Sequence, residues 1–362
     1  MAGVYISYPF CNQKCTYCNF ASGVFAPALR ARYRDALLRE IKAAKPAWVP
    51  ETVYLGGGTP STMDPAELDT VLEAVPGRPW REATLECAPA TVTSERVRRW
   101  LHAGINRVSL GVQSFVRSEL ARTGRTHTAD IVAADVNSLR ANGISNINLD
   151  LIAGLPGQNE RSWEESLGWI ERLSPPHVSV YMLEVDEDSR LGREILLKGS
   201  RYGAADAPDE DVTAALYERA VERLRGMGIS RYEISNFAQP GFESTHNMKY
   251  WRREAYIGFG ADAHSFSNGL RWQNVESVET YVERSPDVRT SETPAIEDEE
   301  KFFIGLRLEE GIEPTESDRQ RHGETILRFV RGGMMEEAGT RLRLTARGIM
   351  VSNEIFQEFL SA

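Results

Sequence analysis

The run Pro9-Phe10-Cys11-Asn12-Gln13-Lys14-Cys15-Thr16-Tyr17-Cys18 decides how the rest of this chain is interpreted. It places three thiols, Cys11, Cys15 and Cys18, within eight residues. Cubane iron-sulfur clusters usually take four cysteines, so three thiolates would leave one iron open to an exogenous ligand. Because an open metal position is typical of reactive sites, the run predicts an iron-sulfur centre with a vacant coordination position.

Two other uses of these thiols stay open. A structural zinc site could be completed by a distant histidine or by Cys87, although the sequence lacks the second ligand pair that such sites usually have. A disulfide framework is disfavoured because Cys87 is the fourth and last cysteine and the first residues read as a strand rather than a signal peptide. We therefore expect a reducing compartment and a cytoplasmic protein.

Length and composition indicate a globular protein with one large and one smaller domain. The chain has 362 residues, of which 41% are hydrophobic and 26% charged. No apolar run approaches the roughly 18 to 20 residues of a membrane helix. A balance of 42 basic against 52 acidic residues gives a net charge of -10, which argues against a nucleic-acid partner.

Strand-like and helix-like stretches alternate through the first half. The expected strands are residues 4–8, 52–55, 83–87, 106–110, 146–152 and 177–183. The expected helices are residues 28–44, 65–74, 94–102, 129–142 and 162–173. Repeated βα units predict a parallel sheet, either doubly wound or an incomplete barrel, with its reactive groups at the carboxyl ends of the strands.

Polar and glycine residues follow these strands. The second strand runs into Gly56-Gly57-Gly58-Thr59-Pro60, which lacks the signatures of phosphate and dinucleotide loops; a plain turn stays an alternative. Glu86, Gln113 and Asp150 stand at later strand ends, and Arg125 lies just beyond the fourth strand. Polar groups that converge on one barrel mouth predict a polar ligand site.

Four ordered motifs carry a family resemblance. Together with the cysteine run and the glycine turn, Gly111-Val112-Gln113-Ser114-Phe115 and Asp150-Leu151-Ile152-Ala153-Gly154-Leu155-Pro156 resemble radical S-adenosylmethionine (SAM) proteins, in the branch that contains oxygen-independent coproporphyrinogen III oxidase. The resemblance runs almost end to end. It implies an α/β fold with a partial (β/α)6 TIM-like barrel, a 4Fe-4S cluster, and SAM bound across the barrel mouth.

The resemblance also assigns roles to single residues. It implies that Cys11, Cys15 and Cys18 ligate the cluster and that SAM chelates the open iron. The implied SAM contacts are Tyr5, Tyr17 against the adenine, Gly57, Gly58 and Thr59 at the methionyl part, Glu86 and Arg125 at its charged ends, Gln113 and Asp150 at the ribose hydroxyls, and Ile152 under the base. These roles are chemically sensible, since a guanidinium can hold a carboxylate through two hydrogen bonds.

Three features separate the oxidases from the heme chaperones of the HemW type. The oxidases carry another cysteine two positions after the third, where this chain has Phe20, and they begin with a long extension, where this chain has ten residues before Cys11. The chaperones carry a His-Asn-x-x-Tyr-Trp signature, and this chain has His246-Asn247-Met248-Lys249-Tyr250-Trp251. The chain therefore resembles the heme chaperones.

This resemblance implies that the protein binds heme and delivers it to acceptor hemoproteins such as membrane respiratory enzymes. The alternative is radical oxidative decarboxylation of coproporphyrinogen III in porphyrin biosynthesis, with reductive cleavage of SAM. Whether SAM is cleaved at all, and whether the chain forms a homodimer, stay open. Radical modification of RNA would call for an appended basic domain, which the sequence lacks.

His246 is the first candidate for heme contact, because imidazole is a common protein ligand of heme iron. Tyr250 and Trp251 would offer flat apolar surface to the macrocycle. Alternatively, the histidine satisfies backbone groups in a turn between strands and the two aromatic residues belong to the core. His264 is a weaker candidate, in a segment expected to form a strand and a glycine turn.

The chain departs from the family pattern near the site. Ser7 and Tyr8 stand where the family usually has histidine and isoleucine, and Ala88 stands where it has asparagine. These changes leave the cluster ligands intact but remove any polar contact of the usual side chains. We expect Cys87 to be a small buried hydrophobic residue rather than a ligand.

The sequence changes character after about residue 285. Residues 285–287 and 291–294 are expected to form a polar linker between a core of residues 1–285 and a C-terminal domain of residues 286–362. In that domain we expect helices over residues 297–308, 324–331 and 348–360 and a hairpin over residues 335–344. Helices followed by a hairpin suggest a winged-helix-like unit.

Overall fold

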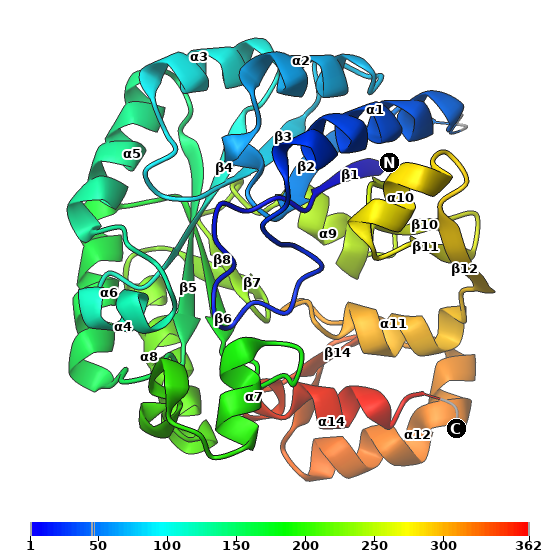
Figure 1. Ribbon diagram of the computed structural model, residues 1–362. Helices are drawn as coiled ribbons and strands as arrows, with labels where there is room; N and C mark the ends of the chain where they lie inside the picture. The colour runs from blue at the N-terminus through cyan, green and yellow to red at the C-terminus, as the bar shows by residue number, and fades with distance from the viewer. Residues whose placement is uncertain (1, 45, 47, 361–362) are drawn as a thin grey trace.

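A computed structural model describes residues 2–44, 46 and 48–360. Its centre is a row of six parallel strands that alternate with helices (Figure 1). The strands are β1 (Gly3–Tyr8), β2 (Thr52–Gly57), β3 (Glu82–Cys87), β4 (Arg107–Gln113), β5 (Asn146–Ala153) and β6 (His177–Met182). All six expected strands are confirmed, with ends that differ by a few residues.

The helices that connect these strands lie outside the sheet. They are α1 (Pro27–Ala43), α2 (Pro65–Glu73), α3 (Ser94–His102), α4 (Arg117–Arg122), α5 (Ala129–Ala141) and α6 (Glu160–Leu173). The short helix α4 was not expected from the sequence. Asp64 and Thr93 cap α2 and α3, because their side-chain oxygens accept hydrogen bonds from first-turn amides.

The order of the strands confirms the partial barrel. Strands β1 to β6 are neighbours in chain order, so the sheet lacks the reversal of order that defines a doubly wound fold. The two edges are extended rather than joined: β8 (Asn236–Ala238) and β7 (Ser230–Glu233) follow β6, and β9 (Tyr256–Phe259) pairs with β1. The six-stranded core is therefore an open barrel within a twelve-stranded sheet.

Further elements complete the core. Between β6 and β9 lie α7 (Arg190–Leu196), α8 (Glu210–Gly226) and α9 (Thr245–Trp251), and beyond β9 lie β10 (His264–Ser267), β11 (Leu270–Asn274), α10 (Val278–Arg284) and β12 (Arg289–Pro294). The segment around His264 is a strand that follows a glycine turn, as expected, with Gly260 at φ +101°. The signature at His246 lies in α9, so the alternative of a turn between strands is wrong.

The two faces of the barrel strands differ sharply in chemistry. Side chains on the outer face, such as Val4, Ile6 and Leu55, are fully or almost fully buried in the hydrophobic core. On the opposite face the ring of Tyr54 lies near that of Tyr5, and the hydroxyl of Tyr54 bonds to a carboxylate of β3. The period of two along each strand therefore separates an apolar outer face from a polar interior.

The C-terminal part agrees only partly with expectation. It comprises α11 (Glu297–Gly305), α12 (Glu316–Arg331), β13 (Met335–Ala338), β14 (Arg341–Leu344), α13 (Ala346–Met350) and α14 (Ser352–Gln357). The hairpin is confirmed, whereas the second helix begins eight residues earlier than expected and the last one is divided at Val351. The winged-helix-like description and the domain division at residue 285 stay predictions.

The prediction of a polar linker is wrong for residues 291–294. Residues 291–294 belong to β12, which pairs antiparallel with β11 at the edge of the large sheet. Every residue of β12 is exposed, so the strand shows none of the alternation that would have revealed it. The described part of the chain contains no helix with both the length and the hydrophobicity of a membrane span.

Candidate functional site

A cavity of about 330 Å³ lies at the carboxyl ends of the barrel strands. It is lined by the three clustered cysteines and by all but one of the residues predicted to contact SAM: Tyr17, Gly57, Gly58, Thr59, Glu86, Gln113, Arg125, Asp150 and Ile152. The exception is Tyr5, whose ring lies beside Tyr54 inside the barrel. The fold thus gathers residues from six separate segments at one place, as expected for ligand sites of barrels.

Backbone hydrogen bonds shape the loop that carries the cysteines. The amide of Cys11 donates to the carbonyl of Gly23, and the amide of Thr16 donates to that of Thr123. Cys11 is buried, and burial raises the pKa of its thiol. The loop is therefore held at Cys11 and at Thr16 by the backbone of neighbouring segments.

The three thiols line the same cavity. Ligands of a single zinc converge on one point, whereas in a cubane cluster each cysteine binds a different iron. Within the described part of the chain, no three His, Cys, Asp or Glu side chains are arranged to hold one metal ion. Three cysteines are the number that would leave the fourth iron of a cluster open to another ligand.

The glycine turn packs directly against this loop. A Cβ atom on Gly58 would lie 2.8 Å from the backbone nitrogen and oxygen of Phe10, and Gly57 has φ +105°. The amide of Thr59 donates to the carbonyl of Phe10 at 2.9 Å. Glycine is therefore required here for close approach and for backbone conformation, which is more than a plain turn demands.

Glu86 faces the cavity from the end of β3. Its carboxylate accepts hydrogen bonds from the hydroxyl of Tyr54 at 2.9 Å and from the amide of Gly57 at 3.2 Å. Burial, with the nearby charge of Asp150, raises its pKa to about 7. A carboxyl group poised near neutrality in a cleft is typical of ligand-binding and reactive sites.

Gln113 shows strain and an unused polar atom at the end of β4. Its backbone has φ +68°, an unfavourable conformation for a residue with a side chain, and its buried Oε1 atom has no hydrogen-bond partner among the described residues. A buried acceptor without a partner costs free energy unless a ligand supplies a donor. A hydroxyl of a bound molecule would satisfy it.

Arg125 and Asp150 complete the polar wall. Arg125 donates to the carbonyl of Gly111 at 2.6 Å and to the hydroxyl of Tyr17 at 3.2 Å. Asp150 accepts from Ser109 and Asn148, and burial raises its pKa. The cavity therefore offers a cation and two carboxyl groups, which suits a ligand that carries both an ammonium and a carboxylate.

Several residues that line this cavity were not predicted from the sequence. Ser109, Tyr181, Met182, Lys14 and Phe20 also line the cavity. Ser109 and Tyr181 could have been found, since they continue the alternation of the interior face of β4 and β6. Phe20 is 66% exposed, so the position that separates this chain from the oxidases lies at the cavity rim.

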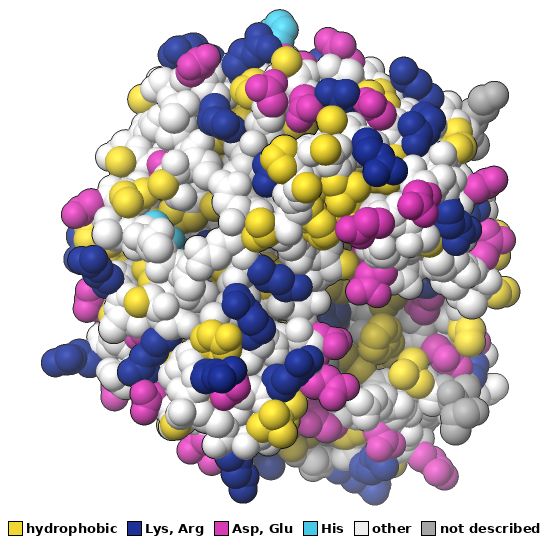
Figure 2. Space-filling view, in the orientation of Figure 1, with side chains coloured by type: hydrophobic (Ala, Val, Ile, Leu, Met, Phe, Trp, Pro, Cys, Tyr) yellow, Lys and Arg dark blue, Asp and Glu magenta, His cyan; other side chains and the backbone are white. Residues whose placement is uncertain are grey.

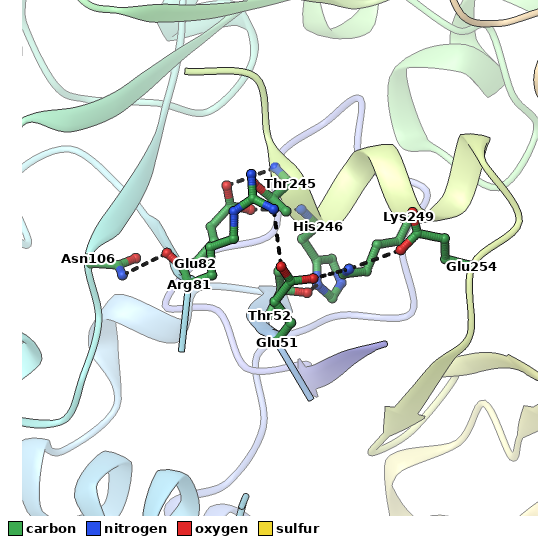
Figure 3. Close-up of polar contacts among 9 residues, drawn as sticks. All are labelled: Glu51, Thr52, Arg81, Glu82, Asn106, Thr245, His246, Lys249 and Glu254. Carbon is green, nitrogen blue, oxygen red and sulfur yellow. Dashed lines mark hydrogen bonds and ion pairs between the residues drawn. The ribbon is translucent and has the colours of Figure 1, made fainter. Parts of the chain in front are cut away.

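The helix α9 lies at the other end of the barrel. Glu82, the first residue of β3, accepts hydrogen bonds from the amides of Thr245 and His246 (Figure 3). It also accepts one from the hydroxyl of Ser244. A carboxylate at a helix N-terminus satisfies free amides and complements the helix dipole. Lys249 of the same helix is buried and pairs with Glu51 and Glu254. These contacts anchor α9 beneath the strands.

His246 is fully buried within this anchor. One ring nitrogen bonds to the hydroxyl of Thr52 and the other to that of Tyr250, both at 2.8 Å. Burial, with the charges of Lys249 and Arg107, lowers its pKa to about 3, so the ring is neutral at pH 7. Both nitrogens are thus engaged inside the fold, and these contacts favour a structural role over heme ligation.

The other residues considered for heme contact also lie away from the cavity at the barrel mouth. The ring of Tyr250 packs edge-on against Tyr256 at 4.6 Å, and Trp251 lies under the guanidinium of Arg307 at 4.7 Å. His264 is exposed at the start of β10. None of these side chains lines the cavity at the carboxyl ends of the strands.

A second cavity, of about 850 Å³, lies outside the barrel between the end of α1 and the strands β9 to β12. Its apolar lining includes Trp48, Ile257, Phe259, Leu270, Trp272 and Val288. The exposed side chains of Arg284 and Arg289 stand at its rim together with Asp287 and Glu292. This cavity is open to solvent and shares no residue with the first.

The partial barrel and the three-cysteine site at its mouth define a radical SAM protein. The family model of the radical SAM superfamily matches residues 5–170. In its fold the chain is similar to the coproporphyrinogen III oxidase HemN of Escherichia coli, a radical SAM enzyme, with a TM-score of 0.85 over 99% of this chain and 89% of that one. At 19% identity this similarity concerns the fold alone.

Curated relatives give the family. The chain is 32% identical to the heme chaperone HemW of Bacillus subtilis over 99% of both chains, and 32% identical to that of Lactococcus lactis over 98% of this chain and 96% of the relative. The heme chaperone HemW of Escherichia coli is 31% identical over 99% of this chain and 98% of its own length. The chain belongs to the HemW family, and the expected cofactors of its superfamily are a 4Fe-4S cluster and SAM.

Proposed function

We propose that this protein is a heme chaperone that carries a 4Fe-4S cluster and SAM and passes heme to acceptor hemoproteins. The observation that carries the proposal is similarity over essentially the whole length to proteins named as heme chaperones, combined with the cysteine-lined cavity. Cys11, Cys15 and Cys18 would hold the cluster. The unpartnered Oε1 atom of Gln113 and the carboxyl groups of Glu86 and Asp150 support SAM as the second ligand.

Two observations support the chaperone over coproporphyrinogen oxidation, the alternative function. Relatives that are similar over essentially the whole chain are named as heme chaperones. Phe20, rather than a further cysteine, stands at the rim of the cavity at the barrel mouth. Reductive cleavage of SAM is not required for heme transfer, although the cluster could supply the electron.

We propose the cytoplasm as the site of action, in agreement with four free cysteines and a cluster that needs reduced thiols.

We propose no nucleic-acid partner for this protein. Figure 2 shows Lys and Arg side chains interspersed with Asp and Glu over the face that it presents. Membrane respiratory enzymes as acceptors are a proposal that follows from the sequence resemblance, and a homodimer is a separate proposal.

We also propose a location for the heme-binding site. The resemblance points to His246, Tyr250 and Trp251, but His246 has both ring nitrogens engaged. We propose the outer cavity instead, because it is larger, open and lined by two tryptophans. At its rim Arg284 donates only to the backbone carbonyls of Asp287 and Arg289 in the described structure, so its charge is available to a carboxylate of the ligand.

A heme titration distinguishes the two places. We expect Arg284→Glu to weaken heme binding roughly tenfold, because it reverses a charge that meets a carboxylate, and His246→Ala to leave the affinity unchanged within about twofold. Affinity and the Soret spectrum would be measured for wild type and both variants at a temperature at which circular dichroism shows all three folded. Loss of the Soret band in His246→Ala with normal binding by Arg284→Glu would favour the signature and refute the outer cavity.

A further inference from the structure

A continuous set of contacts joins the helix α9 at one end of the barrel to Glu86 at the other. The ring of His246 packs against the ring of Tyr54, with centroids 5.3 Å apart. The hydroxyl of Tyr54 donates to Oε1 of Glu86 at 2.9 Å, while the amide of Gly57 donates to its Oε2. Tyr54 was not among the site residues predicted from sequence, and it does not itself line the cavity at the barrel mouth.

The His246 end of this set of contacts is tightly packed. The ring of His246 is held by Thr52 and Tyr250, and a Cβ atom on Gly3 would lie 3.1 Å from that ring and 2.9 Å from the hydroxyl of Thr52. The neighbouring backbone amides of α9 are bound to Glu82. The His246 ring therefore has little freedom to move, and Tyr54 rests on a fixed support.

We infer that Tyr54 is a positioning residue for SAM: its hydroxyl holds the carboxylate of Glu86 in the orientation that meets the ligand, and α9 fixes Tyr54 from below through His246. This inference rests on the proposed SAM site. It gives the His-Asn-x-x-Tyr-Trp helix a function at the barrel mouth that requires no contact with heme. A carboxylate that accepts hydrogen bonds from two fixed donors is already oriented before the ligand arrives. Less conformational entropy of the Glu86 side chain is therefore lost when SAM binds.

The hydroxyl of Tyr54 affects the protonation of Glu86, because this carboxyl group is buried among other titratable groups. The titratable and charged groups that face Glu86 come from every element around it: Tyr5 from β1, Tyr54 from β2, Cys87 beside it on β3, Arg107 from β4, Asp150 from β5, Tyr181 from β6 and Tyr250 from α9. Of the tyrosines in this set, Tyr54 donates a hydrogen bond to the carboxylate in the described structure. That bond favours the charged form of Glu86, opposing burial and the charge of Asp150.

The test is the pH dependence of SAM binding, measured by calorimetry on anaerobically reconstituted protein from pH 6 to 9. Glu86 pairs with the ammonium group of SAM most strongly as a charged carboxylate, so the affinity of wild type should rise with pH through the neutral range. Removal of the Tyr54 hydroxyl in Tyr54→Phe should move the midpoint of this rise upward by about one pH unit. SAM should then bind roughly five- to tenfold more weakly at pH 7 and nearly normally at pH 9.

Controls separate positioning from general loss of structure. Tyr217→Phe removes another buried tyrosine hydroxyl, which bonds to the carbonyl of Ile234 outside the barrel, and should leave the profile unchanged. Gly3→Ala introduces a methyl group against His246 and should shift the midpoint in the same direction by a smaller amount. Titrations of SAM itself are common to all variants and cancel in the comparison.

The pH profiles of the two variants test the role of Tyr54 and the role of α9 separately. An unshifted midpoint in Tyr54→Phe, or an equal loss of affinity at every pH, would overturn the positioning role. A shift in Tyr54→Phe with none in Gly3→Ala would overturn the part played by α9. If wild type failed to bind SAM at all, the proposed cofactor site itself would be wrong, which is a different result from a normal profile that Tyr54→Phe leaves unmoved.

Discussion

Replacing Cys11, Cys15 or Cys18 singly with serine should abolish the iron-sulfur cluster. Each thiolate is expected to bind a different iron, and a hydroxyl is a poor substitute for the soft thiolate ligand that such clusters require. Because the three thiols line one cavity and each would hold a separate corner of the cluster, the loss of any one should prevent assembly. Iron and acid-labile sulfide would be measured after anaerobic reconstitution, together with the visible absorption of the cluster.

Cys87 supplies the matched control for this experiment. It is buried, burial raises the pKa of its thiol far above the usual value, and its sulfur lies near the carbonyl of Leu85. Cys87→Ala should therefore retain wild-type iron and sulfide. A variant that lacks Cys15 yet assembles a full cluster, or a Cys87→Ala variant that loses it, would contradict the ligand assignment.

The second large effect is expected at the opposite end of the barrel. Glu82→Ala should lower the free energy of unfolding by roughly 3 to 5 kcal/mol, because it leaves buried donors of Ser244, Thr245 and His246 without an acceptor. The same change removes the negative charge that complements the N-terminus of α9. Urea unfolding followed by circular dichroism measures the change in midpoint.

Two further variants calibrate that result. Glu82→Gln keeps an oxygen acceptor and should cost clearly less than Glu82→Ala. Arg81→Ala removes an exposed partner of Glu51 and should change the stability by less than about 1 kcal/mol, as is usual for surface ion pairs. If Glu82→Ala and Arg81→Ala had the same unfolding midpoint, the anchor role of Glu82 would be refuted.

The barrel and most of the site could be predicted because their signals are local. Strands with alternating or continuous apolar residues, such as residues 146–152, occur where the structure has them, and the polar residues at their ends reach one cavity. Parallel strands bring their carboxyl ends together whatever the helices between them do. Residues such as Gln113 and Asp150 were therefore placed correctly without any knowledge of long-range contacts.

The role of α9 could not be predicted in the same way. Its partners Thr52 and Glu82 lie more than 160 positions away in sequence, and a histidine in a polar run carries no local sign of burial. Tyr54 was missed for a similar reason, since an aromatic residue in a strand is usually part of the apolar core. The wholly exposed strand β12 and the divided last helix were misread because neither has a regular apolar pattern.

Parallel assays of the same preparation distinguish heme handling from porphyrin chemistry in this protein. The anaerobically reconstituted protein, with SAM and a reductant, would be assayed in parallel for heme binding and for conversion of coproporphyrinogen III. We expect saturable heme binding and no protoporphyrinogen. Substantial formation of protoporphyrinogen, with weak or absent heme binding, would contradict the account and assign the protein to the oxidases.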